Sequence, residues 1–200
     1  TAVATLAERR PHTRFVVPMH PNPIVRHQIV PHLGDRPNVV LTEPMAYVEF
    51  ASLLARSDLV LTDSGGIQEE APVVGTPVLV AREETERTEG VDAGTLRLVG
   101  TDPTRIVEWS ERLLDDTPER RHMLAAENPY GDGRSAPRIA DALRFLAGDD
   151  RIVPEQFGPG FDRRAVMEAA GYESLRHATE QSAFGAAPNE GHDAERWEHV

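Results

Sequence analysis

The segment 59–70, with the sequence LVLTDSGGIQEE, has the residue types and the spacing needed to bind a phosphate group. Its apolar start predicts a buried strand that breaks at Asp63-Ser64-Gly65-Gly66 directly into a helix. The first N–H groups of a helix lack intrahelical partners and carry the positive end of the macrodipole, so an anion there gains hydrogen bonds and favourable charge. A side chain at either glycine would hold the ligand away. Ser64, Gly65 and Gly66 are therefore a predicted phosphate cradle.

Glu70 extends this pattern, because it lies four residues beyond Gly66 and hence on the same face of the predicted helix. A carboxylate at that place could accept hydrogen bonds from ribose hydroxyls, which suggests a nucleoside diphosphate with a sugar attached. The alternative is an ordinary structural turn, since a strand, a glycine turn and a helix follow one another in every parallel α/β protein. Context along the chain has to decide between the two.

The composition is that of a globular chain, with 200 residues of which 40% are hydrophobic. No apolar run reaches the length needed to cross a bilayer, and the absence of cysteine removes disulfide and thiol chemistry. The chain opens at Thr1 without a secretory leader, and the missing start methionine suggests a trimmed or partial chain. We expect a cytoplasmic protein.

The charge is strongly acidic, with 33 acidic residues against 21 basic ones, a formal net charge of −12, and no lysine. Proteins of salt-loving organisms have such surfaces, and GC-rich codon usage also replaces lysine with arginine, so both explanations stay open. In either case the long-range field disfavours binding to nucleic acid or to an anionic membrane. An anionic ligand has to be held by local groups.

Apolar strand runs alternate with helical patterns along the first 147 residues. Strands are expected at 13–18, 38–42, 59–62, 77–81 and 95–99, and helices at 2–10, 24–33, 46–56, 66–72, 103–115 and 136–146. This order predicts an α/β fold with a Rossmann-like parallel sheet flanked by helices. Ligands bind beyond the carboxyl ends of such strands, where the chain carries His20, Glu43, Ser64 and Arg82.

Three segments together resemble a known family. They are VPMHPNP at 17–23, the long stretch from DSGGIQEE through TERTEG to VGTD at 63–102, and NPYGDG at 128–133. In this order and spacing they closely resemble the non-hydrolysing UDP-N-acetylglucosamine 2-epimerases, over about residues 1–147. The resemblance implies the C-terminal half of a GT-B-type fold, a UDP-sugar in a cleft between two Rossmann-like halves, and interconversion of UDP-GlcNAc and UDP-ManNAc with no added cofactor or metal. It also implies that the N-terminal domain with the catalytic carboxylates is missing from this chain.

The resemblance assigns roles to seven residues. Ser64, Gly65 and Gly66 would hold the diphosphate, Glu70 the ribose and Arg87 a phosphate, while Phe50 would border uracil and His20 would line the cleft. Each role has a structural alternative: Phe50 in the core, His20 bonded to loop backbone, and Arg87 in a solvated cluster with the carboxylates of EETERTE. Arg82 could cap the sheet edge or pair with Glu83 or Glu84, so no ligand contact is assigned to it. Asp63 is expected to stabilise the turn.

The family mechanism eliminates UDP to leave a glycal and then adds UDP back after protonation on the other face. The phosphate cradle and an arginine would stabilise the departing diphosphate by electrostatics, so no catalytic residue is assigned here. Two alternatives are a UDP-sugar-binding module without turnover and a GT-B-type glycosyltransferase fragment. An uncovered cleft wall would favour aggregation or a homodimer.

The end of the chain, at 148–200, is more densely acidic and is expected to be a partly helical or disordered extension. A helix is expected at 163–180. His192, Asp193, Glu195 and His199 are not expected to bind metal, because a mobile end offers no groups to orient the ligands.

Overall fold

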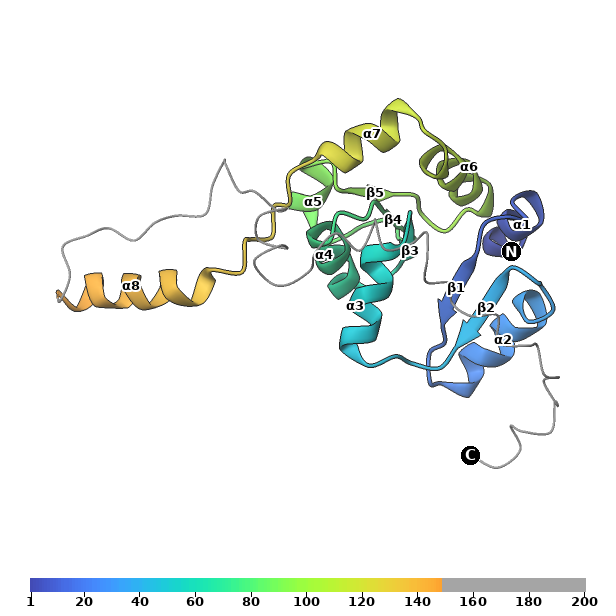
Figure 1. Cartoon of the computed structure of the whole chain (residues 1–200), viewed down its shortest axis with the longest axis horizontal. Coiled ribbons are helices and arrows are strands. Elements are labelled where there is room, and N and C mark those ends of the chain that lie inside the picture. Colours follow the sequence, from blue (N-terminus) through green and yellow to red (C-terminus); the bar gives the residue numbers. More distant parts are fainter. Residues whose placement is uncertain (149–200) are drawn as a thin grey trace, which may run out of the picture.

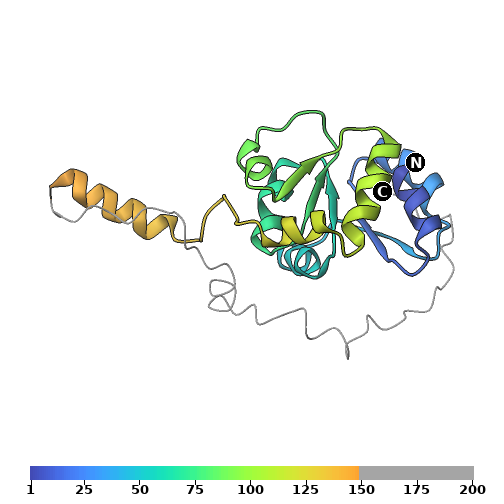
Figure 2. The ribbon, with the colours of Figure 1, turned by 90° about the horizontal axis from the view of Figure 1, so that it is seen from above.

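A computed structural model of the chain describes residues 1–148. The predictions for 149–200, including the helix at 163–180 and those for His192 to His199, lie outside the described residues. Parallel strands alternate with helices over residues 2–114, and two further helices of the described range follow, as Figures 1 and 2 show. The predicted Rossmann-like α/β fold is confirmed. None of the described helices is both long enough and apolar enough to cross a membrane.

The first 42 residues form a two-stranded parallel unit. β1 (Phe15–Pro18) pairs with β2 (Val39–Thr42), with Phe15 opposite Val39. α1 (Ala2–Arg9) precedes β1, and α2 (Pro23–Leu33) connects the two strands. Ala7, Leu33 and Val39 form the buried cluster of this unit.

A three-stranded parallel sheet forms the centre of the molecule, in the order β3 (Val60–Thr62), β4 (Val78–Val80) and β5 (Leu96–Leu98). The three residues of β4 have no exposed surface, as expected of a central parallel strand covered on both faces. Leu79 packs in the cluster of α1 and α6 (Pro103–Leu114). Val78 and Val80 pack instead in the cluster of α3 (Tyr47–Arg56) and α4 (Gly65–Val73). The period of two along the strand therefore assigns its side chains to two different cores.

The remaining helices surround this sheet or follow it. They are α3 (Tyr47–Arg56), α4 (Gly65–Val73), α5 (Thr88–Asp92), α6 (Pro103–Leu114), α7 (Pro118–Ala125) and α8 (Ser135–Ala147). α8 extends away from the rest of the described chain (Figures 1 and 2). Its apolar side chains Ile139, Leu143 and Leu146 are exposed.

α1 joins the two units by packing on α6. Leu6 shares a buried cluster with Ile106 and Leu113 of α6. Beside this cluster, Arg10 forms a bidentate ion pair with Asp115, with N–O distances of 2.9 and 2.7 Å, and this hydrogen bonding lowers the pKa of the Asp115 carboxyl. The N-terminal helix is thus fixed to the C-terminal end of α6.

Two features differ from the sequence-based expectation. The strands form two hydrogen-bonded ladders instead of one sheet, since β1 and β2 pair only with each other. α5 and α7 were not predicted. α5 has five residues including Gly90, so packing has to hold it, and a Cβ at Gly90 would meet the hydroxyl of Tyr130 and the side chain of Leu96.

The predicted turn 128–133 is confirmed, and its side chains fix it. The Asn128 side chain accepts a bond from the Tyr130 N–H at 3.2 Å and donates to the Gly131 carbonyl at 3.0 Å. Asp132 then forms a bidentate pair with Arg138 of α8, at 2.5 and 2.6 Å. Hydrogen bonds from Arg138 lower the pKa of Asp132 to about 2.

We predict that the Asp132–Arg138 pair makes stability depend on acid. Because the folded-state pKa of Asp132 lies below its ordinary value, the stabilisation is complete above the ordinary pKa and is lost as the pH falls through about 2. Asp132→Asn keeps an acceptor for the Arg134 N–H but removes the charge. Thermal unfolding followed by circular dichroism should show a lower midpoint for the variant near neutral pH and convergence with the wild type toward pH 2. An equal difference at both ends of this range would contradict the assignment.

Candidate functional site

The N-terminus of α4 is open, as the sequence predicts. The helix begins at Gly65 with Ser64 as its N-cap, and the Ser64 side chain makes no capping hydrogen bond. Asn22, Asp102 and Thr117 bond the first amides of α2, α6 and α7, whereas α1, α3, α5 and α8 lack a side-chain cap as α4 does. Within residues 1–148 the amides of Gly65 and Gly66 therefore have no side-chain acceptor, which leaves donors for an anion.

Arg87 lies against this open end. A Cβ placed on Gly65 would be 3.6 Å from Nη2 of Arg87 and 3.8 Å from its Cζ. The guanidinium Nε donates to Oε1 of Glu69 at 2.5 Å, and this bond raises the pKa of Arg87. Glu69 thus occupies the Nε–H of Arg87, while Nη2 lies beside Gly65 of the phosphate cradle. The structure brings Gly65 and Arg87 together. The carboxylate bonded to Arg87 is Glu69, which lies outside EETERTE, while Glu86 of that segment acts on Arg87 through its charge. The contact of Arg87 with a phosphate stays a prediction.

Glu70 lies on the same face of α4 as Gly66, since its Oε1 is 3.6 Å from the place of a Gly66 Cβ. The predicted spacing of one helical turn is confirmed. In the described part of the chain its carboxylate makes neither a hydrogen bond nor an ion pair, so its oxygens are available as acceptors. The adjacent Glu69 was missed by the sequence analysis, and a partner 18 positions from Arg87 leaves no local signal in the sequence.

His20 lies at the carboxyl end of β1 and is exposed. Its Nδ1 accepts the Asn22 N–H at 3.0 Å, so the neutral ring carries its proton on Nε2. Arg26 bonds the His20 carbonyl at 2.9 Å and also forms a bidentate pair with Glu43, which lowers the pKa of that carboxyl. No hydrogen bond or ion pair in the described residues connects His20 with the phosphate cradle.

Phe50 is partly buried and packs on the cluster of Leu54, Ala71 and Val80. Phe50 thus lies at the edge of the core, which is the structural alternative named for it. Its contact with uracil stays a prediction. Arg82 pairs with Glu86 at 3.5 Å, so of its two structural alternatives the ion pair is formed, but with Glu86 in place of Glu83 or Glu84.

Asp63 does not stabilise the turn, contrary to expectation. The turn is held instead by Thr62, whose buried side-chain oxygen accepts the Ser64 N–H at 3.1 Å. The Asp63 side chain is exposed and makes no hydrogen bond within the described range. The Thr62 hydroxyl, two residues before Ser64, holds the turn without burying a charged group.

Tyr130 encloses the loop that carries Arg87. Its hydroxyl is buried, and burial together with the nearby Glu89 and Glu69 raises its pKa. The phenol is therefore neutral at physiological pH. It packs against Gly90 of α5 and against Leu96.

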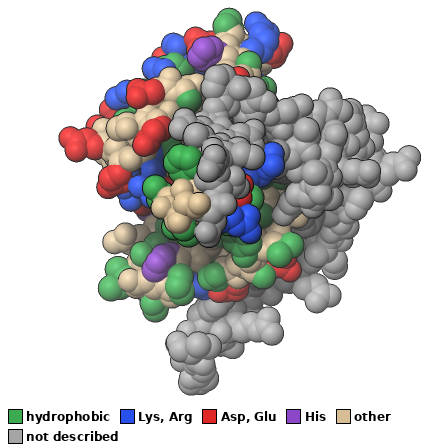
Figure 3. All heavy atoms as spheres, turned by 90° about the vertical axis from the view of Figure 1, so that its left-hand side faces the viewer, with side chains coloured by type: hydrophobic (Ala, Val, Ile, Leu, Met, Phe, Trp, Pro, Cys, Tyr) green, Lys and Arg blue, Asp and Glu red, His purple; other side chains and the backbone are tan. Residues whose placement is uncertain are grey.

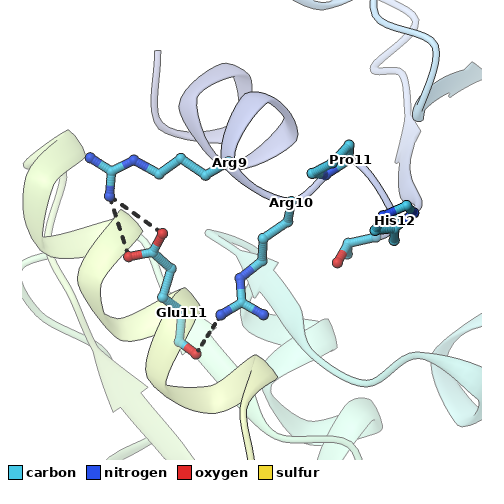
Figure 4. A pocket seen from close by; sticks show the side chains of 6 residues that line it. Arg9, Arg10, Pro11, His12 and Glu111 are labelled. Carbon is cyan, nitrogen blue, oxygen red and sulfur yellow. Dashed lines mark hydrogen bonds and ion pairs between the residues drawn. The ribbon is translucent and has the colours of Figure 1, made fainter.

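A separate hollow of about 350 Å³ lies at the other edge of the strands, between α1 and α6 (Figure 4). Its lining residues 9–13 directly precede β1, whereas ligands of parallel sheets bind beyond the carboxyl ends. Its arginines are already paired, Arg9 and Arg10 both bonding Glu111. We therefore do not place the ligand there.

The surface charge is mixed over the face shown in Figure 3, where acidic and arginine side chains lie next to one another in its upper part. The formal net charge of −12 gives no long-range attraction for an anion. An anion at this surface would have to be held by hydrogen-bond donors at short range.

Comparison with known proteins places the chain in one family. The family model described as UDP-N-acetylglucosamine 2-epimerase matches residues 1–144. The Bacillus subtilis protein of that name is 48% identical over 144 residues, which are 72% of this chain and 38% of the relative. The Escherichia coli (strain K12) protein of that name is 51% identical over 143 residues, again 72% of this chain and 38% of the relative. The chain thus spans about 38% of the length of these relatives.

Solved structures give the same result. A structure titled S. aureus MnaA-UDP co-structure superposes with a TM-score of 0.72 at 41% identity, covering 78% of this chain and 42% of that one. The UDP-GlcNAc 2-epimerase of Neisseria meningitidis, bound to UDP-GlcNAc, superposes with a TM-score of 0.64 at 45% identity, covering 71% of this chain and 39% of that one. With the match of the family model to most of its length, this chain belongs to the UDP-N-acetylglucosamine 2-epimerase family.

Proposed function

We propose that this chain is the UDP-binding half of a UDP-GlcNAc 2-epimerase, the isomerase that interconverts UDP-GlcNAc and UDP-ManNAc. The observation that carries the proposal is the open amide end of α4 facing the Arg87 guanidinium. Amides and a guanidinium on one anion are the donors that a diphosphate requires. The UDP and UDP-GlcNAc named in the titles of two superposed structures support the same ligand class.

Each group of the site has a part in this proposal. Ser64, Gly65 and Gly66 hold the diphosphate with Arg87, and the available carboxylate of Glu70 accepts from the ribose hydroxyls. Phe50 flanks the uracil from the edge of the core, and His20 donates its Nε2–H into the cleft. These last two assignments follow from the family resemblance, because the described contacts do not join them to α4.

The proposed chemistry uses the phosphate cradle on the leaving group. As the bond from C1 of the sugar to the diphosphate breaks, negative charge grows on the phosphate oxygens. Donors that are already oriented stabilise that charge without reorganisation. Held in place, the UDP adds back once the sugar has been protonated on the opposite face. The acid and base at C2 are supplied in this proposal by the carboxylates of an N-terminal domain.

The direct test titrates the 200-residue chain with UDP and with uridine in a calorimeter, and then incubates it with UDP-GlcNAc while the anomeric NMR signals are followed. We expect tighter binding of UDP than of uridine, because only UDP reaches the α4 amides, and no UDP-ManNAc from the chain alone. Equal affinities would contradict the diphosphate site. Appearance of UDP-ManNAc would show that the chain carries its own acid and base.

Arg87→Ala and Glu70→Ala are each expected to weaken UDP binding by about 1 to 3 kcal/mol, the scale of a charge-assisted hydrogen bond. Calorimetry provides the measurement. Arg82→Ala is the matched control, since Arg82 is an arginine of the same loop that pairs with the exposed Glu86. Its UDP affinity should stay near that of the wild type, and an equal loss in Arg82→Ala and Arg87→Ala would reduce the effect to net charge.

Gly65→Ala and Gly65→Val test the space in front of the amides. An added Cβ lies at ordinary contact distance from Arg87, so the ligand-free fold tolerates it. The methyl group nevertheless occupies the place proposed for the phosphate. We expect an unchanged thermal midpoint, a UDP affinity lowered at least about tenfold for alanine, and no measurable binding for valine. Wild-type affinity in the valine variant would refute the phosphate cradle.

A further inference from the structure

The buried side chain of Gln68 is not explained by the site described so far. It lies on α4 with no exposed surface, and its Nε2 donates to the Ser64 carbonyl at 3.2 Å. The same carbonyl accepts the Gln68 backbone N–H at 3.3 Å. One residue thus bonds the N-cap of α4 through both its backbone and its side chain.

The other end of the amide reaches the loop after β4. Its Oε1 accepts the hydroxyl of Thr85 at 2.5 Å, and the Thr85 oxygen in turn accepts the backbone N–H of Arg87 at 3.1 Å. The directions follow from the chemistry of the ends, because the Ser64 carbonyl can only accept and the Arg87 N–H can only donate. Each hydrogen bond along this path therefore has one defined donor and one defined acceptor.

Glu69, the next residue on α4, bonds the Nε of the same arginine. Two consecutive residues of the helix thus hold Arg87 at its backbone and at its guanidinium. The path starts at Ser64, passes through Gln68 and Thr85, and returns through Arg87 to the face of Gly65. It connects the two sources of donors that the phosphate needs.

We propose that Gln68 and Thr85 are positioning residues that hold Arg87 in register with the open amides of α4. They touch no phosphate themselves. Because Gln68 is fully buried, its oxygen has no water to replace Thr85, and loss of the hydroxyl leaves that oxygen and the Arg87 N–H without their partners. Glu69 then holds the guanidinium alone, without the backbone bond that fixes the loop in front of Gly65. This inference rests on the proposed function, since it concerns the same diphosphate site.

The test compares three variants of the chain by calorimetry with UDP. Thr85→Val removes the hydroxyl at nearly constant shape and should lower the UDP affinity about tenfold, whereas Thr85→Ser keeps the hydroxyl and should stay within about twofold. Thr76→Val is the matched control: its hydroxyl donates to the Leu54 carbonyl at 2.7 Å and is also buried, but it precedes β4, at the opposite edge of the sheet. It should lower the thermal midpoint and leave the affinity unchanged. Thr85→Ala serves in place of a valine variant that does not fold.

A double-mutant cycle separates positioning from general damage. If Thr85 acts through Arg87, then Thr85→Val in an Arg87→Ala background causes no further loss of UDP affinity. The same loss in both backgrounds, or no loss in the wild-type background, overturns the inference. Absence of UDP binding by the wild type would instead overturn the proposed function.

The ligand-free chain gives an independent readout. The Nε–H of Arg87 is held by Glu69, so its NMR signal should be sharp and protected from exchange in the wild type and in Thr85→Ser. Thr85→Val should broaden it and speed its exchange. An Arg87 signal that is identical in Thr85→Val and in the wild type would show that the hydroxyl does not position the arginine.

Discussion

The site depends on the parallel pairing of β3 with β4. Their ladder continues past its last residues through the bond from the Ala81 N–H to the Thr62 carbonyl at 2.8 Å. Because the strands run in one direction, the start of α4 and the loop to Arg87 leave the sheet at the same edge. Burial of β4 on both faces fixes that edge from two cores at once. The position of the α4 N-terminus beside Arg87 therefore depends on the packing of the three aliphatic residues of β4.

In a chain this acidic, an anion has to be held by groups close to it. The net charge of −12 repels phosphate over long distances, and salt weakens that repulsion while leaving short hydrogen bonds largely intact. Helix amides carry no formal charge to be neutralised by neighbours, and the pairing of Arg87 with Glu69 leaves the terminal N–H groups of the guanidinium available. The carboxylate of Glu69 balances the charge of the guanidinium and also fixes its direction.

Sequence reasoning found what local patterns encode. The strand, the glycine turn and the face shared by Gly66 and Glu70 follow from periods of two and of 3.6 residues. The α7 helix was missed although Thr117 followed by Pro118 is a helix-start signal that could have found it. Glu69 as the partner of Arg87, and Gln68 as the link to Thr85, depend on contacts across 17 or 18 positions that no local pattern reports. The division into two ladders is likewise a tertiary property.

The central claim is that one anion binds between the α4 amides and Arg87. The most direct measurement is a two-dimensional ¹⁵N–¹H NMR titration of the chain with UDP, which observes each backbone amide and the Arg87 Nε–H separately. The account predicts that the largest shifts fall on the amides of Gly65 and Gly66 and on the Arg87 side chain, with saturation at a common affinity. Shifts that leave these three signals unchanged and fall instead on the hollow at residues 9–13 would contradict it.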